Sequence, residues 1–202
     1  MVRYQDIRSR IKDGDAAIFR NGGLISRVSS KYTHIGMLAW MRNRAGEPHK
    51  LLLIESREFR GARVIAFAYE VNRCPGRIDI FRPTCSQDIC DLAVEHAVAC
   101  TGNGYGYRGI GEIALRKMTL LRALGVLRVD RPYDTTPSPP EQRRHCSRDY
   151  IRHYRVAALE CGSPWEMIRM MHEELVEPIH LVRSSELQLV EENGVAWEGI
   201  TA

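Results

Sequence analysis

The first half of the chain alternates short apolar runs with segments of turn residues. Two such runs, 35–41 and 51–55, are rich in Ile, Leu and Trp, and the segment 42–48 between them contains Asn, Gly and Pro. Short apolar runs on both sides of a turn segment are typical of a β-hairpin. Shorter patterns of the same kind predict further strands at 15–19, 64–66 and 77–82.

Helical spacing is found on either side of these strands. From Ser86 to Thr101 apolar residues recur with helical periodicity, with Ser86 as a suitable N-cap and Gly102 as a stop signal. Another helix is predicted at about 3–11, and residues 23–31 fit a short helix or a loop. Together the elements predict an α+β fold, in which an antiparallel sheet is flanked by helices.

The predicted hairpin brings two polar residues together. If its turn is centred between Arg44 and Ala45, His34 lies directly opposite Glu55 on one face of the sheet. Their Cβ atoms would then be roughly 5 Å apart. A carboxylate at that position could hold one imidazole nitrogen and leave the other free for a thiol.

This pairing depends on the register of the hairpin. The same register places Leu38 opposite Leu51. A slip of one residue would turn His34 and Glu55 to opposite faces of the sheet. From these residues alone, an ordinary polar pair at the end of a sheet is the alternative to a functional pair.

A cysteine far downstream could supply the third group of a cysteine hydrolase, which combines a thiol, an imidazole and a carboxylate. This residue is Cys146. On a helix, His145 is rotated by about 100° from Cys146 and His153 lies about 10 Å further along the axis, so neither faces the sulfur. His34 is therefore the candidate base. The common alternative for any cysteine is a small buried apolar residue.

Short motifs also follow one another in a characteristic order. They are Asp13-Gly14-Asp15-Ala16-Ala17-Ile18-Phe19, a Ser-rich segment at 26–32, Thr33-His34-Ile35-Gly36, Leu53-Ile54-Glu55, Cys146-Ser147, Glu177-Pro178 and Ser184-Ser185-Glu186-Leu187. This order resembles the circularly permuted branch of the NlpC-like, papain-fold cysteine hydrolases, the YiiX-like group. The resemblance covers roughly residues 12–82 and 143–190. It fails at 102–108, where relatives often carry Tyr-Asp.

The resemblance implies a permuted papain-like (NlpC-like) fold with Cys146 as nucleophile, His34 as general base and acid, and Glu55 as the group that orients His34. It implies no metal or organic cofactor. The wider family cleaves peptide or peptidoglycan amides, whereas related proteins with the same arrangement transfer acyl groups of lipids. We therefore expect a cysteine peptidase or amidase that acts on a peptide, a peptidoglycan fragment or an acylated small substrate. The alternatives are a lipid acyltransferase or thioesterase of the same fold, and a catalytically silent binding or structural protein.

The start of the helix that carries Cys146 can be predicted in two ways. In relatives the nucleophile lies in the first turn, where the helix dipole and a nearby imidazolium favour the thiolate. Here Ser138-Pro139-Pro140-Glu141 is also a capping box with proline at the first helical position, which would place Cys146 in mid-helix. The later start is favoured, because the resemblance places a loop before the cysteine.

Three other patterns have a structural and a functional interpretation. Cys90, His96 and Cys100 could bind zinc, but apolar residues share their helix face and favour core packing. Residues 104–109 match G-x-G-x-x-G, but they follow a helix rather than a strand, which favours a loop over a nucleotide site. The segment 110–129 is predicted as a helix packed on the domain, with a cationic lid or a lipid-contacting surface as alternatives.

Composition narrows the function classes. The 202 residues are 44% hydrophobic and contain neither repeats nor low-complexity tracts, which favours one domain spanning 1–202. The net charge of +4 is mild and the arginines are dispersed, so no nucleic-acid partner is expected. Without an apolar signal region or a membrane-spanning stretch, a cytoplasmic protein is expected, and membrane-surface contact is not favoured. The six cysteines are expected to be reduced, and the oligomeric state stays open.

Overall fold

The structure is a computed structural model that describes residues 2–20, 32–57, 60–103, 146–167 and 176–196. Its elements, in chain order, are β1 (Val2–Arg3), α1 (Tyr4–Arg8), β2 (Ala16–Arg20), β3 (His34–Arg42), β4 (Pro48–Arg57), β5 (Gly61–Ala66), α3 (Phe67–Arg73), β6 (Arg77–Pro83), α4 (Gln87–Ala99), α7 (Cys146–Glu160), α8 (Pro178–Val182) and β7 (Leu187–Ala196).

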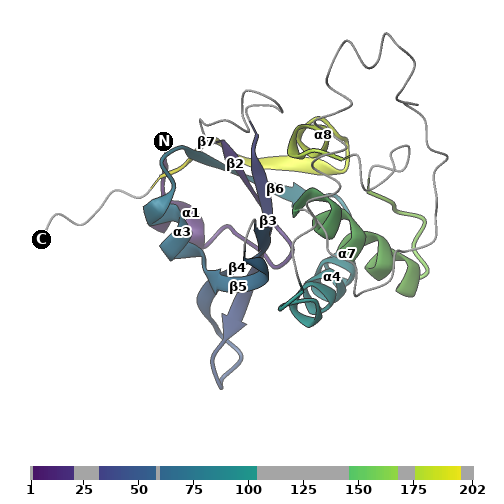
Figure 1. The fold of residues 1–202 in the computed structure, drawn as a ribbon. Helices are drawn as coiled ribbons and strands as arrows, with labels where there is room; N and C mark the ends of the chain where they lie inside the picture. Colours follow the sequence, from purple (N-terminus) through teal and green to yellow (C-terminus); the bar gives the residue numbers. More distant parts are fainter. Residues whose placement is uncertain (1, 21–31, 58–59, 104–145, 168–175, 197–202) are drawn as a thin grey trace, which may run out of the picture.

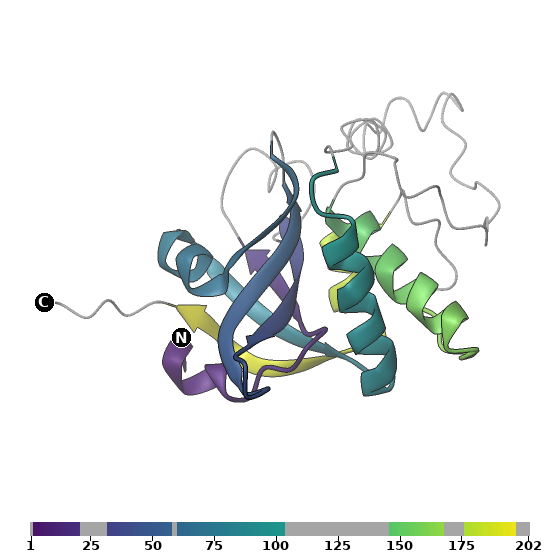
Figure 2. The same cartoon turned by 90° about the horizontal axis from the view of Figure 1, so that it is seen from below.

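Within the described residues, the strands form one sheet in the order β1-β7-β6-β2-β3-β4-β5 (Figure 1). All neighbours pair antiparallel except β1 and β7, which pair in parallel over two residues. Helices α4 and α7 pack together beside one face of the sheet, while α1 and α3 lie on the other (Figure 2). The predicted α+β class, an antiparallel sheet flanked by helices, is therefore confirmed.

The strand β2 shows why the sheet has a core on each side. Ala16 and Ile18 belong to the apolar cluster beneath α4 and α7, whereas Ala17 and Phe19 belong to the cluster that α1 and α3 cover. Successive side chains of a strand point to opposite faces, so a strand covered on both faces is apolar throughout. The continuous apolar runs of the sequence follow from this two-sided burial.

The hairpin of β3 and β4 is confirmed, but its predicted register is wrong. Leu38 lies opposite Leu53 rather than Leu51, a shift of two residues. The turn is longer than predicted because the Asn43 side-chain oxygen accepts hydrogen bonds from the backbone N–H groups of Ala45 and Glu47, both at 2.9 Å.

A β-bulge between Met41 and Arg42 adds to the displacement. Gly46 adopts a φ of +82°, a left-handed conformation that favours glycine and completes the longer turn. Because a shift of two residues preserves which face a side chain points to, His34 and Glu55 remain on the same face of the sheet.

Other boundaries differ from the sequence prediction in smaller ways. The helix expected at 3–11 is the five-residue α1, preceded by the short β1. The predicted strands at 15–19, 64–66 and 77–82 correspond to β2, β5 and β6, and the helix predicted within 86–101 is α4, with Ser86 at its N-cap.

The helix α3 was not predicted. It has only seven residues and no side-chain hydrogen bond at its N-cap, so it lacks the usual sequence signals. It is stabilised by burying Phe67 and Val71 in the core on its side of the sheet. The strand β7 was not predicted either, and it joins the sheet between β1 and β6.

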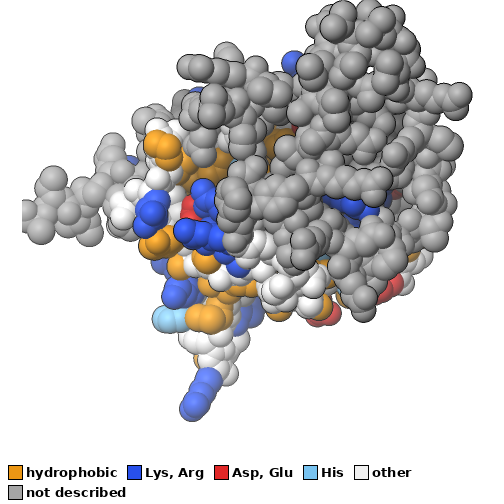
Figure 3. Space-filling model, in the orientation of Figure 1, with side chains coloured by type: hydrophobic (Ala, Val, Ile, Leu, Met, Phe, Trp, Pro, Cys, Tyr) orange, Lys and Arg blue, Asp and Glu red, His pale blue; other side chains and the backbone are white. Residues whose placement is uncertain are grey.

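Several sequence predictions fall outside the described residues. They concern the segments 23–31, 104–109, 110–129 and 138–141. Where the structure describes the chain, no helix is long and apolar enough to cross a membrane. Figure 3 shows Lys and Arg side chains of the described residues at several separate places on one face, down to the tip of the β3–β4 hairpin.

Candidate active site

Two strands bring His34 and Glu55 into direct contact. His34 is the first residue of β3 and Glu55 lies near the end of β4. The His34 Nε2 atom lies 2.6 Å from the Glu55 Oε2 atom, although the two residues are not opposite each other in the ladder. The Glu55 side chain is completely buried, whereas 14% of the His34 side chain is exposed. The carboxylate is thus shielded, and the imidazole can still be reached from outside.

Gly36 lies beside Glu55 and leaves no space for a side chain of its own. A Cβ atom at this position would lie 2.6 Å from Leu53 Cδ1 and 3.2 Å from Glu55 Cβ. Both distances are shorter than ordinary van der Waals contacts. A side chain at position 36 would therefore press against Leu53 and Glu55, and glycine avoids this contact beside the carboxylate that holds His34.

The helix α7 brings Cys146 to the same place. This helix packs against β3 and β4, and Cys146 is its first described residue. The side chain of Cys146 is buried, and it forms a hydrogen bond with the His34 imidazole. Since Nε2 of His34 is bound to Glu55, Nδ1 is the nitrogen that remains for the sulfur. The structure thus places all three predicted site residues, Cys146, His34 and Glu55, in one chain of contacts.

Cys146, His34 and Glu55 stabilise one another's charged forms. Burial lowers the pKa of His34, but the Cys146 thiolate, through its charge and its hydrogen bond, and then the Glu55 carboxylate raise this pKa to about 10. Burial raises the pKa of Glu55, but the hydrogen bond and charge of His34, together with Arg63 and Arg57, lower it to about 2. At neutral pH the imidazolium is therefore paired with an ionised carboxylate, and its positive charge favours the thiolate form of Cys146.

Two arginines complete the surroundings of Glu55. Arg63 lies opposite Glu55 on β5 and donates to its Oε1 atom through Nε at 2.8 Å and also through Nη2. Arg57 Nη1 lies 3.5 Å from the same oxygen. Both arginines also contact Glu70 of α3. These three residues were missed from the sequence, because β5 was predicted to start only at residue 64 and α3 was not predicted.

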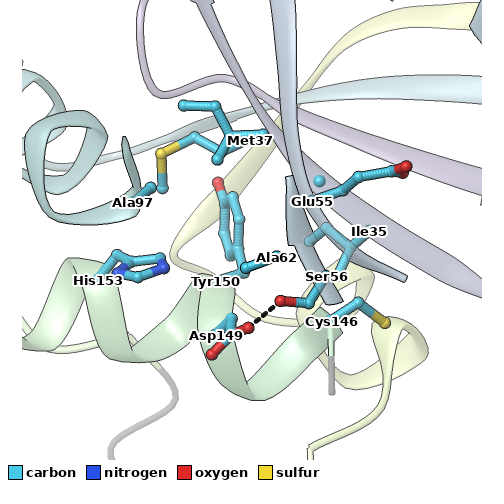
Figure 4. Close-up of a pocket in the computed structure, with 12 residues that line it drawn as sticks. Ile35, Met37, Glu55, Ser56, Ala62, Ala97, Cys146, Asp149, Tyr150 and His153 are labelled. Atoms are coloured by element: carbon cyan, nitrogen blue, oxygen red, sulfur yellow. Dashed lines mark hydrogen bonds between the residues drawn. The ribbon is translucent and has the colours of Figure 1, made fainter. Parts of the chain in front are cut away.

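A second contact joins the strand of Glu55 to the helix of Cys146. The Ser56 hydroxyl donates a hydrogen bond to Asp149 Oδ2 (Figure 4). Ser56 follows Glu55 directly, and Asp149 comes three residues after Cys146. The bond therefore fixes the distance between the strand and the helix close to Glu55 and Cys146.

These residues line a small cavity of about 20 Å³ between α7 and the sheet. His153 lines it as well, but it lies at the opposite end of the cavity from Cys146 (Figure 4). The Cys146 sulfur and the Glu55 carboxylate point away from His153. This arrangement agrees with the sequence argument that His153 does not face the sulfur, whereas His145 lies outside the described residues.

The alternative zinc site does not form as a cluster. Cys90 is buried in the core beneath α4, with Ala93 and Ala97. His96 Nε2 instead lies 3.1 Å from Glu160 Oε2 of α7. Among the residues that the structure describes, no group of three His, Cys, Asp or Glu side chains could hold a metal ion.

Compared with protein-family models and with curated proteins, the sequence matches none. The chemistry of the site is therefore inferred from the arrangement of its residues alone. A thiol, a base that can also act as an acid, and a buried carboxylate that fixes the base are the components needed for attack on a carbonyl carbon.

Proposed function

We propose that this protein is a cysteine hydrolase that cleaves an amide or ester bond through an acyl-enzyme, with Cys146 as nucleophile, His34 as proton carrier and Glu55 as the group that orients His34. The observation that carries this proposal is the contact of 2.6 Å between His34 Nε2 and Glu55 Oε2, with the Cys146 sulfur bound to the same imidazole. A His–Glu pair that only stabilises the fold does not require a cysteine at the second imidazole nitrogen, whereas a cysteine hydrolase does.

In the first half of the reaction, the Cys146 thiolate attacks the carbonyl carbon of the substrate, and the carbonyl π electrons move to oxygen. The backbone N–H of Cys146 helps to stabilise this oxyanion. The carbon–nitrogen or carbon–oxygen bond then breaks, and the His34 imidazolium gives its proton to the departing amine or alcohol. The products are a thioester on Cys146 and a neutral imidazole.

In the second half, the neutral His34 takes a proton from water, whose oxygen attacks the thioester carbon. The carbon–sulfur bond breaks and releases the carboxylic acid. The thiolate and the imidazolium are restored, so the net reaction consumes one water for each bond cleaved. Glu55 stays ionised throughout and holds His34 at Nε2.

We also propose that the sheet, α4 and α7 represent a permuted papain-like (NlpC-like) fold. The support is the chain order, in which the strands that carry His34 and Glu55 precede the helix that carries Cys146. The resemblance in sequence indicates the same order.

The substrate supplies an acyl group, and its class separates the peptidase or amidase from the lipid-directed alternatives. A screen of muropeptides, acyl-lysine peptides and lipid esters should be run on the wild type, Cys146→Ala and Cys161→Ala. Cys161 is exposed just after α7, which makes it a matched control.

We expect the wild type and Cys161→Ala to turn over one substrate class, with a mass increase on Cys146 from the acyl-enzyme, and Cys146→Ala to be inactive. Turnover of amides supports the peptidase or amidase. Turnover confined to lipid esters favours the acyltransferase or thioesterase. Equal activity of Cys146→Ala and the wild type would overturn the proposal, and an alkylatable Cys146 without turnover of any class would favour a silent binding protein.

A further inference from the structure

The Glu55 carboxylate uses its two oxygens differently. Oε2 faces His34, at 2.6 Å from Nε2. Oε1 accepts two hydrogen bonds from Arg63, one from Nε at 2.8 Å and one from Nη2. A carboxylate gripped by the planar fork of a guanidinium cannot rotate freely, so Oε2 stays directed at the imidazole.

Arg63 is itself held in place by a closed ring of charges. Its Nη2 atom lies 3.1 Å from Glu70 Oε1, and Glu70 Oε2 lies 2.6 Å from Arg57 Nη1. Arg57 closes the ring at 3.5 Å from Glu55 Oε1. The side chains of Glu55, Glu70 and Arg63 are 0%, 7% and 17% exposed, so water screens their charges only weakly, whereas Arg57 is 38% exposed and lies at the outer edge of the ring.

The ring also balances the charge of the site. Glu55, Glu70 and the Cys146 thiolate carry three negative charges, and His34, Arg57 and Arg63 carry three positive ones. Loss of Arg63 would leave the buried group with one excess negative charge whenever Cys146 is ionised. Because burial disfavours net charge, the thiol form of Cys146 would gain stability relative to the thiolate.

We propose that Arg63 is a positioning residue, which holds the Glu55 carboxylate toward His34 and, together with Glu70, sets the charge balance that allows Cys146 to ionise. This inference rests on the proposed function, and it adds two residues that control the orientation of Glu55 and the ionisation of Cys146 at the same site. The sequence places Arg63 and Glu70 seven residues apart, and only the pairing of β5 with β4 and the position of α3 bring both to Glu55.

The described charged groups around Glu55 come from five elements. They are His34 on β3, Arg57 on its own strand β4, Arg63 on β5, Glu70 on α3 and Cys146 on α7. Asp149 and His153 of α7 line the cavity with Cys146, and Ser56 binds Asp149 from the other face of β4. These last groups are the same in every variant below, so they do not affect the comparison.

The test measures the rate at which iodoacetamide alkylates Cys146 between pH 3 and pH 8, followed by mass spectrometry of the intact cysteine peptides. The midpoint of the acid limb reports the ionisation of Cys146. We expect Arg63→Gln to raise this midpoint by about one pH unit, and Glu70→Gln to lower it by about half a unit, since they remove charges of opposite sign at distances of several ångströms.

Two variants serve as matched comparisons. Arg63→Lys keeps the positive charge and should restore the wild-type midpoint, while losing part of the turnover because an ammonium cannot grip the carboxylate as a fork. Arg73→Gln removes one positive charge from α3, where Arg73 is exposed and bonds Tyr69. It should leave the midpoint unchanged.

Shifts of opposite sign for Arg63→Gln and Glu70→Gln support the proposal, and equal midpoints or shifts of the same sign overturn it. If Arg63→Gln does not fold, the pair Arg63→Lys and Glu70→Gln decides, because only the second should move the midpoint. Alkylation requires no substrate. A failure of the proposed hydrolase would appear as missing turnover with these shifts intact, whereas a failure of this inference would appear as unmoved midpoints in an active enzyme.

Discussion

The His34 imidazole and the Glu55 carboxylate meet diagonally across two strands rather than face to face. His34 Nε2 and Glu55 Oε2 lie 2.6 Å apart, and Gly36 beside Glu55 stands where any side chain would press against Leu53 and Glu55. This diagonal places His34 at the very start of β3, where it can also reach Cys146 at the start of the described part of α7. The glycine therefore belongs to the immediate surroundings of Glu55, and its replacement is a test of the site.

The reactivity of Cys146 provides the first prediction. Near pH 6, iodoacetamide should modify Cys146 well before the other five cysteines, because an ordinary thiol with a pKa of about 8.5 is then mostly protonated. His34→Ala should remove this advantage, since it removes the cation that stabilises the thiolate. Mass spectrometry of the labelled peptides measures it, with exposed Cys161 as internal reference. Labelling of several cysteines at one rate would count against an activated Cys146.

The role of Glu55 provides the second prediction. Glu55→Gln keeps the shape of the side chain but loses its charge, so His34 is no longer held as an imidazolium in the correct orientation. We expect kcat to fall by about 100-fold or more, while KM changes little. Steady-state kinetics on the substrate found by the screen measures this. Glu47→Gln, on the exposed hairpin turn, is the control and should match the wild type. A rise in KM with unchanged kcat would assign Glu55 to substrate binding instead.

The pairing of His34 with Glu55 could be predicted from the sequence in part. The alternation of the hairpin correctly placed both residues on one face, and an error of two residues in register does not change the face. The error itself arose because Asn43 organises a longer turn through its side chain, and because a bulge follows Met41. Neither the Asn43 turn nor the bulge changes the spacing of apolar residues, so the hydrophobic pattern could not reveal them.

The remaining parts of the site could not be predicted from local patterns. Contact between Cys146 and His34 depends on how α7 packs on the sheet, across more than a hundred residues of chain, and the sequence indicated it only through a family resemblance. Arg63 and Glu70 were missed since β5 extends beyond its apolar residues and α3 is too short to show periodicity. The contacts of such buried charges with Glu55 can be identified only once the pairing of the strands is known.

Acid denaturation provides a third prediction. The pKa of Glu55 is lowered from its ordinary value of 4.5 to about 2 in the folded protein. A lowered pKa contributes stability that is fully present above pH 4.5 and is lost as the pH falls toward 2. We expect the free energy of unfolding of the wild type to decrease over this window more steeply than that of Glu55→Gln. Urea denaturation at pH 6, 4.5 and 3 measures both slopes. Parallel curves for the two proteins would contradict an ionised, paired Glu55.

The contact between Ser56 and Asp149 leads to a fourth prediction. Ser56→Ala removes the hydroxyl that links β4 to α7 and leaves an Asp149 oxygen without this donor. We expect a loss of stability of about 1–3 kcal/mol, together with a lower kcat, because the distance between Cys146 and the strand of Glu55 is less well fixed. Thermal unfolding and kinetics measure the two effects, and Ser185→Ala, at an exposed position, is the control. A stable variant with full activity would show that the bond does not position Cys146.

Gly36 provides the last prediction, which tests whether the diagonal contact needs an empty position. In Gly36→Ala the new methyl group would lie 2.6 Å from Leu53 Cδ1, 3.0 Å from the Ile54 carbonyl oxygen and 3.2 Å from Glu55 Cβ. The Leu53 methyl can move aside, but the strand backbone and Glu55 must shift. We expect a loss of about 1–3 kcal/mol in stability from overpacking, and a marked loss of kcat because Glu55 is displaced from His34.

The double variant Gly36→Ala/Leu53→Val separates these two effects. The shorter side chain at position 53 relieves the contact with Leu53 Cδ1 but leaves the contacts with Ile54 and Glu55 unchanged. Its melting temperature should therefore recover partly relative to Gly36→Ala, whereas its kcat should stay low. Leu53→Val alone is the matched control and should remain active, since it does not touch the space beside Glu55. Recovery of kcat in step with stability would mean that Gly36 serves only the packing of the core and does not affect the position of Glu55.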